Sequence, residues 1–397
     1  MDFSKYIAGH VREIPRSGIR DFFEVVQTMT DVISLGIGEP DYVTPWRIRE
    51  AAVFGMEKGR TGYTSNLGLP KLRNAIAHYV ERRYGVNYHP KDEILVSVGV
   101  SEALDIALRA LLNPGDEVIF HEPSYVSYHP SVLLSYGKPV SVETSAAHDF
   151  RLPAGDIAKA ITPRTKVLLL NFPTNPTGGV LRAQDLQLIA ELCIRHDLIV
   201  LSDEIYSELI YDGTEHTSIA SLPGMRDRTV LLNGCSKSFA MTGFRVGYAC
   251  APSPIIEAMM KIHQYAIMCA STMSQEAAIE ALENCQREVA TMRSDYERRR
   301  NFVVSRLTEI GLPCHTPKGA FYVFPDITPA GLTSRDFSLQ LLKSKKVAVV
   351  PGTAFGSSGE GFVRCCFATG FERLKEAMTR IEQFVRESRK PGQNCDG

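Results

Sequence analysis

The sequence predicts an α/β protein, with a large domain built on a mostly parallel seven-stranded sheet flanked by helices and a smaller α+β domain. Two observations predict this fold class. Seven short apolar runs in the middle of the chain contain few polar residues, which is typical of strands covered on both faces. Helical patterns separate most of these runs, and alternating strands and helices favour a parallel sheet.

The predicted strands and helices of the large domain follow one another closely along the chain. The strands are Ile94–Val98, Val118–Phe120, Val140–Val142, Val167–Leu170, Ile199–Leu201, Val230–Leu232 and Val246–Cys250. The helices between them are Ser101–Leu112, Ser124–Ser135, Pro153–Ala160 and Ala183–His196. Only Asn233–Arg245 separates the last two strands, which is short for a helical crossover. The last strand is therefore expected to run antiparallel.

The second domain is predicted from a different pattern. Ser274–Ile310 has helical spacing and forms one long helix or two. Short strands and helices follow at Ala320–Phe324, Phe337–Lys343, Val347–Val350, Phe362–Phe367 and Glu372–Glu387. The N-terminal segment, Met1–Thr44, has no partner of its own and is expected to pack on this domain. We therefore expect a large domain at residues 45–285 and a small domain built from residues 1–44 and 286–397.

Composition excludes several classes of protein. The 44 basic and 45 acidic residues leave a net charge of −1, so no excess charge points to nucleic acid or an anionic membrane. The apolar content of 44% is that of a folded globular protein. No targeting segment or membrane-spanning run is recognised. Nine cysteines without a C-x-x-C motif are expected to be reduced thiols, which predicts a cytoplasmic location.

The strongest local motif surrounds Lys237, which follows a buried strand and a turn of small residues. Burial of such a lysine lowers its pKa, which prepares the amine to form a Schiff base. Ser236 and Arg245 flank it with a hydroxyl and a guanidinium, groups that suit a phosphate. Taken alone, Lys237 is more simply explained as a surface lysine after a strand.

Polar residues also follow two other predicted strands. Asp203 ends one of them, at the edge where open α/β sheets bind ligands. Burying a charged carboxylate there is energetically unfavourable unless it pairs with a cation, such as a protonated pyridine nitrogen. Asp203 could instead cap the next helix. Tyr206, three residues further on, could reach the same ligand. Asn175 precedes Pro176, and this pair either forms a rigid turn that presents the Asn175 amide, with a cis bond possible, or is an ordinary loop.

Three weaker signals lie elsewhere in the chain. Gly99–Ala103 leads from a strand into a helix, a common phosphate-binding arrangement. Tyr125 could offer its ring face to a planar cofactor or belong to the core. Arg364 stands in an otherwise apolar strand and requires a carboxylate, from a ligand or from a structural salt bridge. We find no metal-ligand motif, P-loop or G-x-S-x-G sequence.

These motifs, in this order, resemble the class I/II aminotransferases, fold-type I enzymes that use pyridoxal 5′-phosphate (PLP). The stretch from Ser236 to Gly247 matches the lysine signature of that family at every constrained position. The resemblance covers about Arg16–Arg386 and is strongest to aromatic and aspartate aminotransferases of archaea and bacteria. Segments shared with that subgroup are Ser17–Arg20, Ser34–Asp41 and Gly319–Tyr322. The sequence departs from most relatives at Tyr125, where they carry Trp or Phe.

The resemblance implies a role for each residue around the cofactor. Lys237 would form the Schiff base and move the substrate proton, and Asp203 would keep the pyridine nitrogen protonated. Tyr206 and Asn175 would hydrogen-bond the phenolic oxygen of the cofactor. Tyr125 would stack on its ring. The phosphate would be held by Ser236, Arg245 and the backbone amides of Val100, Ser101 and Glu102.

The resemblance also implies how substrate is held and which assembly forms. Arg364 would bind the substrate α-carboxylate, together with Asn175 and the backbone of Gly38. Tyr63 matches a tyrosine that reaches the phosphate in the partner subunit, so a homodimer is implied. Ile19 and Tyr265 are candidate walls of the side-chain pocket. No second arginine can be assigned to a dicarboxylate side chain.

The expected function is transamination by a ping-pong mechanism, from an aromatic L-amino acid or aspartate to a 2-oxo acid such as 2-oxoglutarate. One alternative is a PLP-dependent C–S β-lyase on the same scaffold. Another is a non-catalytic regulator that keeps PLP only as a ligand.

Overall fold

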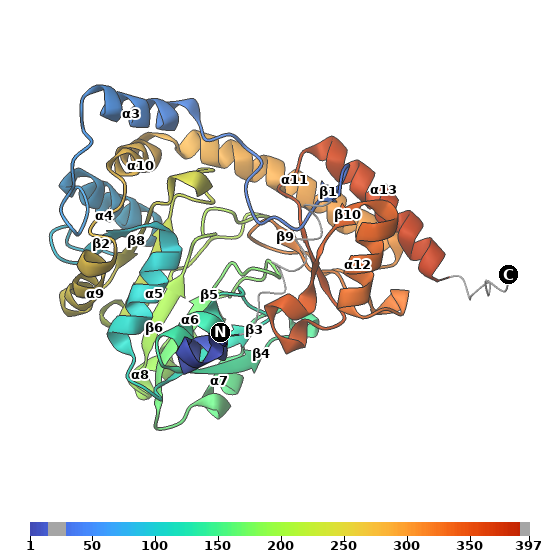
Figure 1. Cartoon of the computed structure of the whole chain (residues 1–397), viewed down its shortest axis with the longest axis horizontal. Coiled ribbons are helices and arrows are strands. Elements are labelled where there is room, and N and C mark those ends of the chain that lie inside the picture. The colour runs from blue at the N-terminus through green and yellow to red at the C-terminus, as the bar shows by residue number, and fades with distance from the viewer. Residues whose placement is uncertain (15–28, 390–397) are drawn as a thin grey trace.

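A twisted sheet of seven strands forms the centre of the larger of two lobes (Figure 1). The computed structural model describes residues 1–14 and 29–389. The strand order is β2-β8-β7-β6-β5-β3-β4. The strands are β2 (Ile94–Ser97), β3 (Glu117–Glu122), β4 (Lys138–Glu143), β5 (Thr165–Asn171), β6 (Ile199–Asp203), β7 (Thr229–Gly234) and β8 (Gly247–Cys250). All pairs are parallel except those of β8, which runs antiparallel to both neighbours. The predicted sheet and its antiparallel strand are confirmed.

Helices cover both faces of this sheet, as its apolar strands require (Figure 1). They are α4 (Pro70–Tyr84), α5 (Gly99–Leu111), α6 (Tyr128–Leu134), α7 (Ala154–Ala160), α8 (Ala183–Arg195), α9 (Ser253–Ala266) and α10 (Thr272–Asn284). A further helix, α3 (Trp46–Glu57), packs on α10. One prediction is wrong in extent, because α6 begins at Tyr128 and not at Ser124. The amide of Ser124 donates instead to the carbonyl of Phe355 in the other lobe, at 2.9 Å.

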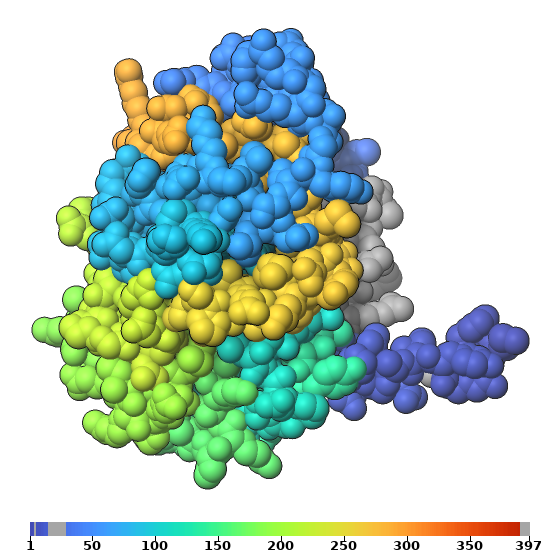
Figure 2. Space-filling model, turned by 90° about the vertical axis from the view of Figure 1, so that its left-hand side faces the viewer, coloured from blue at the N-terminus to red at the C-terminus, as the bar shows by residue number. Residues whose placement is uncertain are grey.

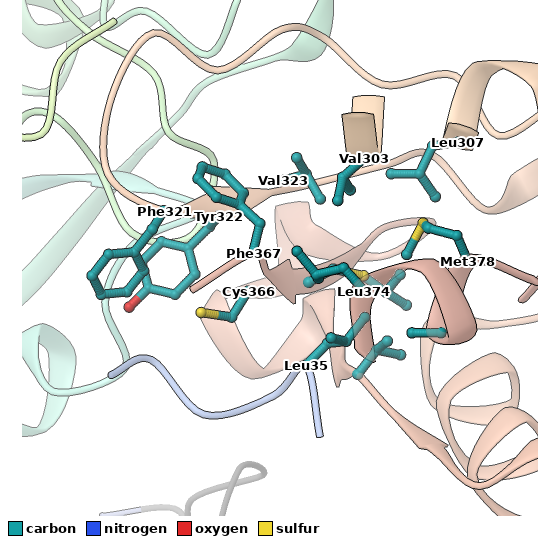
Figure 3. Packing of buried hydrophobic residues seen from close by; sticks show 14 of the residues in the cluster. Leu35, Val303, Leu307, Phe321, Tyr322, Val323, Cys366, Phe367, Leu374 and Met378 are labelled. Atoms are coloured by element: carbon teal, nitrogen blue, oxygen red, sulfur yellow. The ribbon is translucent and has the colours of Figure 1, made fainter. Parts of the chain in front are cut away.

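The smaller lobe combines three long helices with short strands. The helices are α11 (Gln286–Ile310), α12 (Ser334–Lys345) and α13 (Phe371–Ser388). An antiparallel sheet has the order β11-β12-β9, with β9 (Tyr322–Val323), β11 (Val350–Pro351) and β12 (Val363–Cys366). The segment predicted as one helix or two is two helices, which meet at Cys285. Figure 3 shows how side chains of α11, α13, β9 and β12 pack together with Leu35.

The N-terminal part of the chain contributes to both lobes. Strand β1 (Ile33–Ser34) pairs in parallel with β10 (Val347–Ala348), so these residues lie beside the smaller lobe. The short helix α1 (Gly9–Arg12) departs from the expectation, because the His10 ring lies 4.7 Å from that of Tyr136 in the larger lobe. Residues 1–14 project from the body of the molecule there (Figure 2). Ser17–Arg20 and Ile19 lie outside the described residues.

We propose the domain division expected from the sequence, with the exception of α1. The division is supported by the separation of the buried cores along α11. Val289 packs in a cluster of the larger lobe, whereas Met292 packs with Ile33 and Leu35 in the core of the smaller one. No helix among residues 1–14 and 29–389 is long and apolar enough to cross a membrane.

Candidate active site

A cavity of about 720 Å³ lies where β5, β6 and β7 end, between the two lobes. Parallel strands present their carboxyl ends at one edge of a sheet, so the residues that follow them converge there. Of the thirteen predicted site residues, eleven line this cavity. They are Gly38, Val100, Ser101, Tyr125, Asn175, Asp203, Tyr206, Ser236, Lys237, Arg245 and Arg364. Glu102 and Tyr63 do not line it.

Lys237 points into the cavity and not toward solvent. Its Nζ donates a hydrogen bond to the carbonyl oxygen of Gly38, at 2.7 Å. Burial disfavours the ammonium form and lowers the pKa of Lys237 to about 8. A larger share of the amine is then neutral at pH 7 than in an ordinary lysine. This is the state that an amine needs to attack a carbonyl.

Asp203 lies at the end of β6 and is almost fully buried. One carboxylate oxygen accepts a hydrogen bond from the Tyr128 hydroxyl at 2.8 Å, and the other accepts one from the Ile205 amide at 3.2 Å. Burial raises the pKa of Asp203 to about 6, although both hydrogen bonds act in the opposite direction. Within the described part of the chain, no cation forms an ion pair with this carboxylate. The site is therefore suited to a ligand that brings a cation.

Tyr128 is a site residue that sequence reasoning missed. It is the first residue of α6, lines the cavity and packs edge-on against Tyr125, with ring centroids 5.6 Å apart. Its i, i+3 spacing from Tyr125 is the signal that could have found it, because such residues share one side of a helical turn.

Glycines form a narrow cradle at the start of α5. A Cβ at Gly99, where φ is +76°, would lie 2.7 Å from Nη2 of Arg245. A Cβ at Gly247 would lie 2.6 Å from the amide nitrogen of Val100. Only residues without a Cβ let Arg245 and the amides of α5 approach the same point. A guanidinium beside the first amides of a 13-residue helix is suited to a phosphate.

The side chain of Glu102 supports this cradle from outside the cavity. Its carboxylate accepts a hydrogen bond from the Val98 amide at 2.5 Å and lies 2.6 Å from Nδ1 of the fully buried His263. Glu102 thereby fixes the turn between β2 and α5. Sequence reasoning assigned a role to the Glu102 amide and none to its side chain or to His263.

Arg364 is a buried guanidinium without a carboxylate. Its side chain is 3% exposed. Nη1 donates to Oδ1 of Asn175 at 2.9 Å, Nη2 donates to the carbonyl of Gly36 at 2.5 Å, and Nε has no partner. Among the residues that the structure describes, no Asp or Glu forms an ion pair with it, so the alternative of a structural salt bridge is not supported. The arrangement favours a carboxylate supplied by a ligand.

The remaining predicted residues lie as follows. The hydroxyl of Tyr206 is 2.9 Å from that of Tyr322, and the Asn175–Pro176 bond is cis. Tyr63 is 84% exposed and Tyr265 is 88% exposed, so neither contributes to the cavity of its own chain. In residues 1–14 and 29–389 there is no group of His, Cys, Asp and Glu side chains arranged to hold a metal ion.

Comparisons with known proteins agree with this geometry. The family model for aminotransferase class I and II matches residues 30–381. The chain is 49% identical to an aspartate aminotransferase of Pyrococcus abyssi and 46% identical to aromatic-amino-acid aminotransferase 2 of Thermococcus litoralis, each over 94% of this chain and 96% of the relative. An aromatic aminotransferase structure from Pyrococcus horikoshii superposes with a TM-score of 0.89 at 49% identity, covering 93% of this chain and 99% of that one.

The residues of the cavity fit PLP, the cofactor of this family. The buried Asp203 suits a protonated pyridine nitrogen, the Gly99 and Gly247 cradle beside Arg245 suits a phosphate, and Lys237 carries an amine of lowered pKa. Arg364 leaves a binding position for the carboxylate of a substrate next to them. The chain belongs to the class I and II aminotransferases, enzymes that transfer amino groups with the help of PLP.

Proposed function

We propose that the protein moves an amino group from an L-amino acid to a 2-oxo acid by a ping-pong mechanism, with 2-oxoglutarate as an acceptor. The observation that carries this proposal is Arg364, a buried guanidinium that lacks a carboxylate partner among the described residues. It lies in one cavity with Lys237. A substrate carboxylate on Arg364 therefore brings the adjacent Cα within the cavity that also contains the amine.

Each cavity residue has a distinct role in this proposal. Arg364, with Asn175 and the backbone around Gly38, binds and orients the substrate carboxylate. Lys237 takes the proton from the substrate Cα and holds it for the next step. PLP, when bound, supplies an electron sink for the pair of electrons left on Cα. Asp203 holds the proton on the pyridine nitrogen, which makes that sink effective.

The remaining residues bind the cofactor. Tyr206 and Asn175 bind its phenolic oxygen, and Tyr125 packs against its ring. The phosphate is held by Ser236, Arg245 and the amides of Val100, Ser101 and Glu102. The support for these roles is the position of the residues around one cavity and the fit of the glycine cradle to a phosphate.

We propose aromatic L-amino acids as donors ahead of aspartate. Relatives of similar identity are named for each of these substrates, so their names do not decide between them. Among the described residues that line the cavity, the cations are Lys237, Arg245 and Arg364. All three already have a role, and the remaining wall includes Ile37, Val126 and Tyr322. Such a wall suits an apolar or aromatic side chain better than a second carboxylate.

We also propose a homodimer in which Tyr63 reaches the partner subunit's phosphate. Large apolar side chains are exposed in the segments before Tyr63 and around residue 266; they include Val43, Trp46, Val53, Phe54, Tyr265, Ile267 and Met268. Hydrogen bonds from Asn66 to Met268 and from Thr272 to Gly62 join the segment around Tyr63 to the segment that carries Ile267 and Met268. Figure 2 shows these segments on one face of the molecule. Large apolar side chains left exposed mark a candidate surface for association. A sedimentation measurement that finds only monomer would contradict the proposal.

A cytoplasmic location is proposed on the state of the thiols. The eight cysteines among the described residues are all free, and six of them are buried. Free thiols in this number favour a reducing compartment.

Arg364→Gln is expected to lower kcat/KM for the amino acid donor by about 30- to 5,000-fold, the equivalent of about 2–5 kcal/mol for a buried charge pair. For amines that lack the α-carboxylate, kcat/KM should fall far less. The ratio of kcat/KM for the amino acid to that for the matching amine should therefore fall sharply. Steady-state kinetics with both donors checks this. Arg335→Gln, at an exposed arginine of the same lobe, is the control. A variant that loses thermal stability but keeps its preference for the amino acid shows that Arg364 is structural.

A further inference from the structure

Tyr322 is a cavity residue to which the sequence motifs give no role and which the proposed reaction uses only as part of the cavity wall. It lies on β9, at the edge of the small-lobe core, with its hydroxyl directed away from the aliphatic side chains of that core (Figure 3). Its side chain is 1% exposed, and it lines the cavity. A buried tyrosine hydroxyl usually has a hydrogen-bond partner, so a hydroxyl that points out of the core and into the cavity is expected to bind a group there.

The ring of Tyr322 contacts the carboxylate-binding group. The guanidinium carbon of Arg364 lies 4.5 Å from the Tyr322 ring centroid, and it also lies 4.8 Å from the ring centroid of Phe355. An aromatic face near a buried guanidinium attracts the cation and limits its rotation. Two hydrogen bonds, from Nη1 to Asn175 and from Nη2 to Gly36, also hold the guanidinium, so the rings add to these contacts on its faces.

The hydroxyl of Tyr322 contacts the group proposed to bind the phenolic oxygen of the cofactor. It lies 2.9 Å from the hydroxyl of Tyr206. A Cβ at Gly38 would overlap it, so the glycine is what admits the hydroxyl to this position. Gly38 in turn accepts the hydrogen bond of Lys237. Tyr322 therefore contacts Arg364, Tyr206 and the backbone that holds the reactive amine.

Either phenol can donate the hydrogen bond between them, and the proton count ties that direction to what Tyr206 can do for a ligand. Each hydroxyl has one proton, and only one proton can lie between the two oxygens. If Tyr206 donated to Tyr322, it could not also donate to a ligand in the cavity. If Tyr322 donates, the Tyr206 proton stays free, and accepting a hydrogen bond makes Tyr206 a stronger donor. Burial raises the pKa of both phenols, so both keep their protons at neutral pH.

We propose that Tyr322 is a positioning residue that connects the two halves of the site. Its ring orients Arg364 for the substrate carboxylate, and its hydroxyl donates to Tyr206, so that Tyr206 donates to the phenolic oxygen of the bound cofactor. The inference rests on the proposed function, in which PLP occupies this cavity. The other titratable or charged groups that face the two phenols are Tyr125, Arg364 and Cys366.

The hydroxyl is tested with Tyr322→Phe, Tyr206→Phe and the double variant, each loaded with PLP. The pKa of the chromophore is measured by absorbance against pH, without substrate. A hydrogen bond to the phenolic oxygen stabilises its charged form and keeps this pKa low. Tyr322→Phe should raise the chromophore pKa by about 0.4–1 unit, the worth of one hydrogen bond. Tyr206→Phe should raise it further, and Tyr322→Phe should add nothing in the Tyr206→Phe background.

The control is Tyr211→Phe, which removes another buried hydroxyl that donates to the carbonyl of Ala320 outside the cavity. It should leave the chromophore pKa unchanged. The proposal is wrong if Tyr322→Phe leaves the pKa unchanged, or if its full effect persists without the Tyr206 hydroxyl. If no variant or wild-type protein forms a chromophore with PLP, it is the proposed function that has failed.

The ring is tested with Tyr322→Leu. This variant should raise KM for the amino acid about 3- to 30-fold, which is the range of a cation–π contact that is partly to fully desolvated. Tyr322→Phe should keep KM near that of the wild type while shifting the chromophore pKa. If Tyr322 were merely structural, both variants would lose thermal stability, and KM and the chromophore pKa would change together in each of them. That result would overturn the inference.

Discussion

Lys237→Ala is expected to lower turnover at least about 10⁴-fold, because it removes both the covalent attachment and the group that moves the substrate proton. Lys237 is the amine of lowered pKa in the cavity, and its hydrogen bond to Gly38 holds it there. The variant should still bind PLP through the phosphate cradle and Asp203. Borohydride reduction should fix the cofactor covalently to the wild type and not to the variant.

Lys343→Ala, at an exposed lysine of α12, is the matched control and should retain full turnover. The pH dependence of reconstitution adds a second check on Lys237. The rate at which PLP forms its chromophore with the apoprotein should rise with pH and level off near the pKa of about 8. An ordinary lysine would continue to gain reactivity up to about pH 10.4. Near-normal turnover of Lys237→Ala would refute the assignment.

Asp203→Asn is expected to lower kcat by about 30- to 5,000-fold, the equivalent of about 2–5 kcal/mol for one partner of a buried charge pair. Burial raises the pKa of Asp203 to about 6, so a cation on the ligand is needed to favour its ionised form. The amide of asparagine can keep the hydrogen bonds to Tyr128 and Ile205 only in part, and it carries no charge.

The measurement for Asp203 is kcat in the wild type, Asp203→Asn and Tyr128→Phe. Tyr128→Phe keeps the carboxylate and removes only the hydrogen bond of 2.8 Å to it. Its kcat should therefore fall much less than that of Asp203→Asn. A change of less than threefold in Asp203→Asn would show that Asp203 caps the chain after β6 and does not act on the cofactor.

The sequence predicted most of the large-lobe site because parallel strands determine where their ends meet. Asp203 ends β6, and Asn175 and Lys237 follow β5 and β7, so recognising those strands was enough to bring them to one edge. The glycines at 99 and 247 lay inside quoted motifs, yet their role depends on how closely β8 approaches the start of α5. That distance is a property of the packed sheet and has no local pattern.

The contacts between lobes could not be predicted from local patterns. The hydrogen bond between Tyr206 and Tyr322 joins residues 116 positions apart, and that between Lys237 and Gly38 joins residues 199 apart. Both depend on the orientation of the lobes, which the spacing of apolar residues does not encode. The placement of α1 beside Tyr136 was missed for the same reason.

The central claim, that the protein is a PLP-dependent transaminase, is tested most directly by a half-reaction. Holoenzyme is mixed with an aromatic L-amino acid without any 2-oxo acid, and the chromophore, the oxo acid product and ammonia are measured. We predict a bleached chromophore, a single equivalent of oxo acid for each active site and no ammonia, followed by recovery of the chromophore when 2-oxoglutarate is added. Continuous release of ammonia and pyruvate from a cysteine conjugate, with the chromophore retained and no oxo acid required, would contradict the account and identify a C–S β-lyase.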